Sequence, residues 1–422
     1  PVARETLAPM SSSPRTPGPG EVDAAGDEAP GLRLEFELDP SLNLAMQQNG
    51  VSPLRGLTLE NPGAVEVRDI LVRIRAEPEF AETLELRLAV LPPRGRHAWS
   101  APPLALSLSF LAGLRERVEG ALHFEVQAAG CAPLRVRGAL AVLAYDQWGG
   151  LQSLPELLCA FVLPNHPALA PWLRRAAALL EEWTQDPALS GYQAHNRERC
   201  LKTSAALFHA LAEAGIAYVS PPASFEATGQ KVRTAERIQE EKLATCLDLA
   251  LVAAGCLEQA GLNALVVTVA GHAFTGVWLE ETSFPEPALE DGALLEKCIA
   301  LGEIAVFDPT LATQRPARSF EDAMRAAHAR LQDPQEFRCV IDVARSRKGG
   351  VRPLPLRAHG VELQPEGEPG STAPVPAPNL ALPRAAPLPA DASGPDSRIE
   401  RWKRHLLDLT NRNRLLNFLP TK

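Results

Sequence analysis

The region from residue 32 to residue 142 alternates apolar and polar side chains with a period of two, and this pattern constrains the fold most strongly. The alternating runs cover residues 32–38, 65–75, 84–90, 104–110, 122–126 and 134–142. Successive side chains of a β-strand point to opposite faces, so such runs predict strands with one buried and one solvated face. Proline, glycine and asparagine between the runs are typical of turns that join antiparallel strands.

The spacing of these strands predicts an immunoglobulin-like β-sandwich over residues 31–147. No catalytic side chains cluster within it, so we interpret it as a binding or spacer module. Past Tyr145 the apolar side chains recur at helical spacing, over residues 154–162, 169–183 and 197–214. Strands followed by a mixture of helices and strands predict an α+β protein with several domains.

Composition divides the rest of the chain, whose 422 residues exceed what one hydrophobic core usually serves. Residues 1–30 are rich in proline, glycine, serine and alanine, and we expect them to be disordered. A helical connector over residues 148–190 leads to a cysteine domain over residues 191–345. Residues 346–395 return to low complexity with recurring proline, which predicts a semi-stiff linker. Residues 396–422 regain the periodicity of a helix.

Charge and cysteine content argue against several classes of protein. The formal net charge of −9 at pH 7 is unlike a surface built to coat nucleic acid. The 7 cysteines include no CxxC pair, so neither a zinc ribbon nor a disulfide framework is expected. The sequence contains no apolar run of about 18 residues and no recognisable signal peptide, which predicts a cytoplasmic location without a membrane partner. No cofactor or metal ion is implied.

One cysteine stands at a position suited to chemistry. Thr245 is a credible N-cap, and the apolar residues that follow predict a helix from Cys246 to the breaker Gly261. In the first helical turn, unpaired N–H groups and the positive end of the helix dipole stabilise a thiolate, so a lowered pKa and preferential alkylation of Cys246 are expected. The same N–H groups can hold an oxyanion.

A histidine and an aspartate follow on predicted strands. After a strand over residues 264–270, His272 begins a second strand, and Asp308 ends a third strand that starts at residue 304. A cysteine, a histidine and an aspartate in this order predict a nucleophile, a base and a residue that orients the base. His272 would take the thiol proton, while Asp308 would fix the tautomer of His272 and stabilise its imidazolium. Taken singly, each residue also has an ordinary interpretation: a buried thiol, a turn histidine and a turn-forming aspartate before proline.

These three motifs resemble those of the transglutaminase-like, papain-fold cysteine superfamily. The resemblance rests on residues 245–248, where a cysteine opens a long helix, on the Gly-His-Ala-Phe step at 271–274, and on the Asp-Pro-Thr step at 308–310. It implies a Cys246–His272 pair oriented by Asp308 and a thioester or related acyl-enzyme. Members of the superfamily include peptidases, deamidating enzymes, glycanases and crosslinkers.

Two features depart from the family pattern. Residues 243–245 lack the glycine that often precedes the cysteine, and the acidic, proline-containing segment 280–293 separates His272 from Asp308 as either a lid or an exposed insertion. Cys256, in the middle of the same helix, is interpreted as a core residue. The sequence leaves open which side chain supplies an oxyanion donor or lines the cleft; the candidates are Tyr192, Gln193, Tyr218 and Gln239.

Residues 398–420 resemble the opening of an uncharacterised domain that precedes a superfamily 1 helicase in large bacterial proteins. The distinctive part is the run over residues 406–416. The resemblance implies that the chain is the N-terminal part of a longer antiphage helicase protein, whose missing region would be the partner and would contact nucleic acid. No Walker loop occurs in these 422 residues. The basic side chains here either contact nucleic acid or form a solvated face; they are Arg398, Arg401, Lys403, Arg404, Arg412 and Arg414.

Three functions remain open at this point. The first is a cysteine hydrolase, a peptidase acting on a protein or peptide substrate and attached to the helicase. The second is a catalytically inactive protein-binding module that regulates the helicase. The third is a glutamine-directed transferase or deamidase, which differs from the hydrolase in whether an amine or water resolves the acyl-enzyme.

Overall fold

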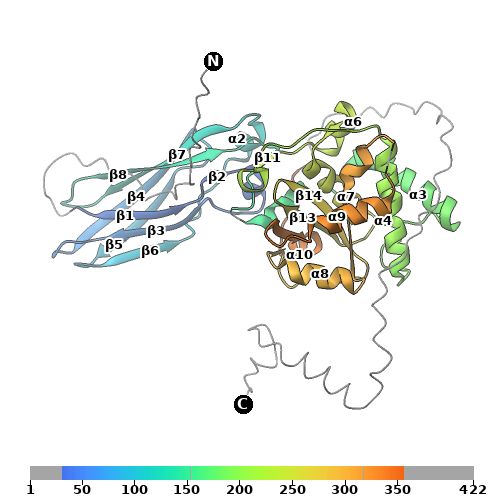
Figure 1. Cartoon of the computed structure of the whole chain (residues 1–422). Coiled ribbons are helices and arrows are strands. Elements are labelled where there is room, and N and C mark those ends of the chain that lie inside the picture. The colour runs from blue at the N-terminus through green and yellow to red at the C-terminus, as the bar shows by residue number, and fades with distance from the viewer. Residues whose placement is uncertain (1–30, 153, 317, 356–422) are drawn as a thin grey trace, which may run out of the picture.

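A computed structural model describes residues 31–355 except 153 and 317 (Figure 1). The protein is mixed α+β, which confirms the predicted fold class at that level. Figure 1 shows an elongated β region beside a second region in which helices surround a central sheet. The predicted disordered start, most of the predicted linker, and the predicted helix over residues 396–422 lie outside the described residues.

Two sheets build the β region. Its strands are β1 Arg33–Leu38, β2 Ser41–Leu42, β3 Leu54–Glu60, β4 Val67–Glu77, β5 Leu84–Leu91, β6 Arg96–Ser100, β7 Val118–Gln127 and β8 Leu134–Val142. The larger sheet has the order β2-β8-β7-β4-β5 and the smaller sheet the order β1-β3-β6. Neighbouring strands are antiparallel except β2, which runs parallel to β8.

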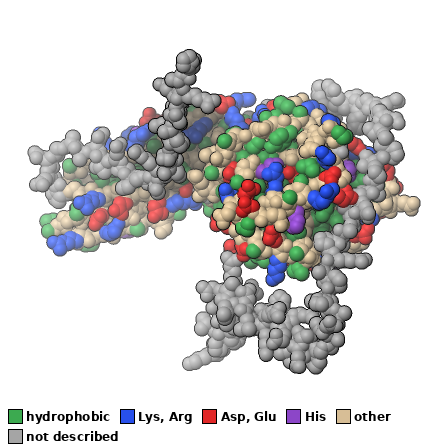
Figure 2. Space-filling model, in the orientation of Figure 1, with side chains coloured by type: hydrophobic (Ala, Val, Ile, Leu, Met, Phe, Trp, Pro, Cys, Tyr) green, Lys and Arg blue, Asp and Glu red, His purple; other side chains and the backbone are tan. Residues whose placement is uncertain are grey.

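The inward faces of the two sheets share one apolar core. Buried side chains of β3, β4 and β7 meet there, and the ring of Phe36 on β1 stacks on Phe124 of β7 at 4.6 Å between centroids. The outward faces carry ion pairs between adjacent strands, such as Arg73 with Glu85 at 2.8 Å. Figure 2 accordingly shows side chains of both charges interspersed along this region. The alternation in sequence therefore reflects one dry and one wet face.

One predicted strand is wrong. Residues 104–110 contribute only an isolated bridge between Leu106 and Ala81, after which helix α2 runs from Leu108 to Gly113. The Ser107 hydroxyl accepts the N–H of Phe110 at 3.3 Å and caps this helix, which competes with an extended conformation. Conversely, the paired strands β3 and β6 were not predicted, because their residues do not alternate cleanly.

The second region contains an antiparallel sheet of order β15-β17-β13-β14-β16. Its strands are β13 Ala264–Val269, β14 His272–Trp278, β15 Ala288–Leu289, β16 Ile304–Phe307 and β17 Phe337–Asp342. Every side chain of β13, β14 and β16 is buried, so both faces of the sheet are covered. Helix α7 (Cys246–Gln259) packs on one face and helix α8 (Gly292–Ala300) packs on the other. The predicted hairpin and third strand are thus present.

Further helices and short strands surround this sheet. The helices are α1 Leu44–Gln48, η1 Pro155–Phe161, η2 Pro167–Leu169, α3 Ala170–Thr184, α4 Arg197–Glu213, α5 Phe225–Thr228, α6 Ala235–Glu241, η3 Pro309–Thr313, α9 Phe320–Arg330 and α10 Val343–Lys348. Helices α3 and α4 match the predicted ones, whereas residues 154–162 form the tighter 3-10 helix η1. Among the described residues, no helix is both long and apolar enough to cross a membrane.

Two short ladders connect segments that are distant in sequence. Strand β10 (Ala217–Tyr218) pairs in parallel with β12 (Leu243–Ala244), directly before the α7 helix. Strand β11 (Gln230–Lys231) pairs with β9 (Gln147–Trp148), which follows the β region. The second ladder therefore ties the two regions together close to the start of α7.

Candidate active site

A buried capping box starts helix α7 at Cys246. The Thr245 hydroxyl accepts the N–H of Asp248 at 3.2 Å, and the Asp248 carboxylate accepts the N–H of Thr245 at 2.9 Å. Asp248 is fully buried, and Arg233 satisfies it further through its backbone N–H at 2.9 Å and its guanidinium at 3.3 Å. The predicted N-cap is confirmed, and Cys246 lies in the first turn.

The sheet brings His272 and Asp308 together. His272 is the first residue of β14, and Asp308 follows β16, the neighbouring strand. The Nε2 atom of His272 lies 2.8 Å from Oδ2 of Asp308, and both side chains are buried. The other carboxylate oxygen of Asp308 accepts the backbone N–H of Thr310 at 3.0 Å and its hydroxyl at 2.7 Å. The carboxylate is therefore held in one orientation.

The charge of Asp308 determines the histidine tautomer. Burial raises the pKa of this carboxyl, but the hydrogen bond and charge of His272 and the bonds from Thr310 outweigh burial, so the pKa is lowered. Arg330 adds a cation, with its Nε 3.7 Å from Oδ2. An ionised carboxylate can only accept, so Nε2 of His272 carries the hydrogen. The lone pair of a neutral ring then lies on Nδ1.

Three donor groups near the sulfur of Cys246 act to lower the pKa of its thiol. They are the backbone N–H of Ala273, the hydroxyl of Tyr218 and the backbone N–H of Leu247. Ala273 directly follows His272, and α7 packs on β14. The structure thus places Cys246 at the N-terminal end of a helix that packs on the strand carrying His272, and it joins His272 directly to Asp308.

The predicted low pKa of the Cys246 thiol is wrong. The pKa of this thiol is raised to about 11, mainly by burial and also by the charge of Asp308, although the donors from Ala273, Tyr218 and Leu247 act in the opposite direction. The side chain is fully buried, so the loss of water around a thiolate exceeds the gain from the helix terminus. In this state the thiol is protonated at neutral pH and needs a base to become a nucleophile.

Tyr218 reaches from solvent to the sulfur. It lies on β10, beside the strand that leads into Cys246, and it is 41% exposed. Burial of its hydroxyl and the nearby Cys246 and Asp308 raise its pKa, so it remains a hydrogen-bond donor at neutral pH. The sequence named Tyr218 as one of four candidates but could not select it, because its position depends on the pairing of β10 with β12.

The other candidate cleft residues are engaged elsewhere. The Tyr192 hydroxyl donates to the carbonyl of Trp278 at 2.8 Å, and the Gln239 amide donates to the carbonyl of Ala168 at 2.5 Å. Gln193 is exposed in a turn. Of the four candidates, Tyr218 is therefore the one whose hydrogen bond reaches Cys246. Among the described residues, no group of three His, Cys, Asp or Glu side chains is arranged to hold a metal ion.

The segment over residues 280–293 is fixed to the domain. Glu280 pairs with Arg197 at 2.6 Å, and the backbone N–H of Phe284 donates to the buried carboxylate of Asp342 at 2.9 Å. Phe284 packs into the core on the α8 side of the sheet, opposite the face covered by α7. These contacts favour a packed insertion over a lid on Cys246.

Alkylation of the free protein tests the state of the thiol. Cys131 is partly exposed, whereas the other cysteines are buried, and Cys256 in the α7 core has a pKa raised to about 12. Iodoacetamide at pH 7 should therefore label Cys131 first, and labelling of Cys246 should keep rising as pH increases toward 11. Peptide mass spectrometry measures both rates. Fast labelling of Cys246 at pH 7 would contradict the buried, protonated thiol.

Replacing Asp248 tests whether the buried capping box organises the site. Asp248→Ala leaves Arg233 and the Thr245 N–H without their acceptor, so the free energy of unfolding should fall by about 3 kcal/mol. Asp291→Ala is a matched control, because Asp291 is an exposed N-cap of α8 that accepts the N–H of Leu294. Its loss should cost about 1 kcal/mol. If urea unfolding gave the same loss of unfolding free energy for both variants, the buried network around Asp248 would add no stability beyond that of an ordinary cap.

Comparison with known proteins adds no family assignment: no family model matches the sequence, and no curated protein matches it. What supports a function is therefore the geometry itself, namely a capped cysteine helix packed against a strand whose histidine is bonded to a buried carboxylate.

Proposed function

We propose that residues 191–345 act as a transglutaminase-like cysteine hydrolase, a peptidase that works through an acyl-enzyme. Cys246 is the nucleophile, His272 the general base and Asp308 the orienting residue. One observation carries the proposal: Nε2 of His272 is bonded to the buried Asp308 carboxylate at 2.8 Å, on a sheet against which the helix that begins at Cys246 packs. Ordinary packing of core residues does not require a buried hydrogen bond between a histidine and a carboxylate.

The proposed domain folds agree with the arrangement of the elements. For the cysteine domain, support comes from a helix that begins at the nucleophile and packs on an antiparallel sheet carrying the histidine. For an immunoglobulin-like sandwich over residues 31–147, support comes from two antiparallel sheets that share a core. The sandwich would serve as a binding or spacer module.

In the first chemical step, the Cys246 sulfur attacks the acyl carbon of the substrate as Nδ1 of His272 takes the thiol proton. The ionised Asp308 stabilises the imidazolium that results. The oxyanion is held by donors that now face the sulfur, the Leu247 N–H and the Tyr218 hydroxyl. Collapse breaks the acyl–nitrogen bond, and the leaving amine takes the proton from His272.

The second step releases the acyl group from sulfur. His272 removes a proton from water as the water oxygen attacks the thioester carbon, and the proton then passes to the departing thiolate. The raised pKa of Cys246 makes its thiolate a poor resting state, so the sulfur returns to the thiol form after each turnover. An amine in place of water would give the transferase reaction, which remains the alternative from the same intermediate.

The inactive binding module is supported by a different observation. Cys246 is fully buried and its pKa is raised to about 11, which are properties of a structural thiol. Under this alternative, the His272–Asp308 pair is a buried polar contact that holds β14 against β16 and η3. The two proposals differ in whether an acyl donor can reach the sulfur.

Acyl transfer from an activated ester separates these proposals. The protein should release p-nitrophenolate from p-nitrophenyl acetate through an acetyl-Cys246 thioester, and Cys246→Ala should abolish this release. Cys256→Ala is the matched control, since Cys256 lies in the same helix but only in the core. Asp308→Asn should lower the rate by roughly 10³-fold, because the histidine loses its tautomer and its counter-charge.

Two results would decide against the hydrolase. Unchanged release by Cys246→Ala would remove the nucleophile, and no release above buffer by the parent protein would favour the binding module. Adding methylamine tests the third function. If the amine accelerates turnover of the acetyl-enzyme and is itself acetylated, then the transferase is the better description.

The role of Tyr218 is tested by removing its hydroxyl alone. Tyr218→Phe takes away one donor to the sulfur and to the oxyanion, so the acylation rate should fall roughly tenfold to hundredfold. Because this hydroxyl lowers the pKa of Cys246, the pH profile of acylation should also move upward. A rate that rises without a change in pH profile would show that the ring only blocks access.

The link to a helicase region and to antiphage defence remains a prediction from the sequence. Residues 398–420, whose resemblance suggests a following helicase region and an antiphage role, lie outside the described residues. That region is proposed as the partner of the cysteine domain and as the source of any contact with nucleic acid. The predicted cytoplasmic location is likewise a proposal.

A further inference from the structure

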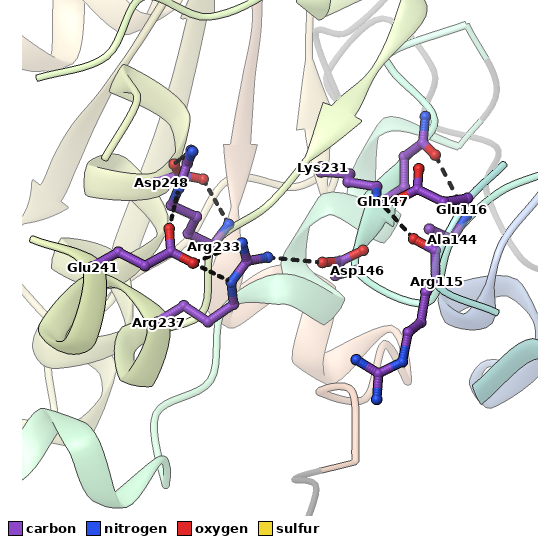
Figure 3. Close-up of polar contacts among 10 residues, drawn as sticks. All are labelled: Arg115, Glu116, Ala144, Asp146, Gln147, Lys231, Arg233, Arg237, Glu241 and Asp248. Carbon is purple, nitrogen blue, oxygen red and sulfur yellow. Dashed lines mark hydrogen bonds and ion pairs between the residues drawn. The ribbon is translucent and has the colours of Figure 1, made fainter. Parts of the chain in front are cut away.

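A cavity of about 760 Å³ lies where the β region meets the second region, which contains Cys246. Arg115 and Glu116 line it from the connection before β7, and helix α6 and strand β11 line it from the other side. Figure 3 shows side chains from both regions in this junction. The volume is typical of ligand sites, which often occur between domains. Cys246 does not line this cavity, so it is separate from the proposed active site.

The walls of the cavity carry more negative than positive charge. Its carboxylates are Glu116, Asp146, Glu236, Glu240 and Glu241, whereas its Lys and Arg side chains are Arg115, Lys231 and Arg237. Lys231 pairs with Glu116 at 2.6 Å, and Arg237 pairs with Asp146 at 3.2 Å and with Glu241 at 2.8 Å. Two cations are thus already neutralised by the protein itself.

Two carboxylates on one face of α6 remain available. Glu236 and Glu240 lie one helical turn apart, and neither forms an ion pair within the described part of the chain. Apolar side chains from both regions complete the walls, among them Leu44, Phe161, Leu163, Val232 and Leu354. Acidic groups beside apolar walls suit Lys or Arg side chains, whose stems are apolar and whose heads are charged.

The sequence contains a segment with matching chemistry. Residues 398–414 hold six Lys and Arg side chains against Glu400 and Asp408, although the whole chain has a net charge of −9. The described chain reaches the cavity wall at Leu354 and Pro355. Residues 356–397 connect this point to the basic segment, and even as a semi-stiff, proline-rich linker they are long enough to let it reach the cavity. The segment is therefore present at a high effective concentration near the cavity.

We propose that the junction cavity binds the basic segment 398–414 of the same chain, with Lys or Arg side chains on Glu236 and Glu240. Charge complementarity and proximity along the chain select this occupant over a free ligand. In a longer protein, this contact would hold whatever follows residue 414 close to the junction between the β region and the region that contains Cys246. The inference concerns docking alone, so it stands or fails independently of the chemistry of Cys246.

Carbodiimide cross-linking of the full 422-residue chain tests the contact directly. This reagent joins a carboxylate to an amine that it touches, with loss of water, and Lys403 is the sole lysine of the segment. The Lys231–Glu116 pair at 2.6 Å, on the same cavity wall, sets the reaction conditions as an internal standard. Peptide mass spectrometry of the monomer should find Lys403 linked to Glu236 or Glu240 at a yield comparable with the standard.

Matched variants identify the groups responsible. In E236Q/E240Q the Lys403 links should vanish while the Lys231–Glu116 link persists. Exchange of charges in E236K/E240K combined with R401E/R404E should restore a link, now between the new lysines and the new glutamates. Lys403 joined to scattered surface carboxylates, or linked only in dimers, would overturn the proposal. So would the absence of any Lys403 link under conditions that form the standard.

Discussion

The buried carboxylate of Asp248 is the interaction on which the arrangement of the site depends. A fully buried carboxylate is stable only when donors replace its water, and here Thr245 and Arg233 supply them. The same bonds begin helix α7 at Cys246, because Thr245 is its N-cap. Removing this cap would free the first turn of α7, and the sulfur would lose its fixed place against Ala273 and the strand that carries His272. The position of Cys246 thus depends on the buried charge of Asp248.

Opposing electrostatic effects control the reactivity of the sulfur. Three donors favour the thiolate, yet burial prevails and holds the pKa at about 11. Under the proposed hydrolase mechanism, the imidazole of His272, oriented by the Asp308 carboxylate, would resolve this conflict by taking the thiol proton as the sulfur attacks an acyl group. A buried, protonated thiol of this kind reacts slowly with general alkylating reagents at neutral pH.

Local patterns predicted the elements that carry the site but not its electrostatics. The helix from Cys246, the hairpin leading to His272 and the strand before Asp308 all follow from periodicity and caps, and each occurs in the structure. Thr245 was also predicted as the N-cap, although the return bond from Asp248 was not. By contrast, the Tyr218 hydroxyl, the Arg233 ion pair and the burial that raises the thiol pKa all depend on segments that meet only in three dimensions. The strand predicted over residues 104–110 failed for the opposite reason, since a local serine cap outweighed the alternation.

A continuous chain of ion pairs joins the cap of α7 to the junction between the regions. Figure 3 shows Arg233 shared by Asp248 and Glu241, and Arg237 shared by Glu241 and Asp146. Because Arg237 divides its charge between the two regions, a cation that binds near Glu241 competes with it and weakens its hold on one partner. Linkage requires the reverse as well: any change at Asp248 that shifts Arg233 alters the affinity of the cavity for that cation. The ion pairs therefore form a continuous physical connection between the wall of the junction cavity and the cap of α7.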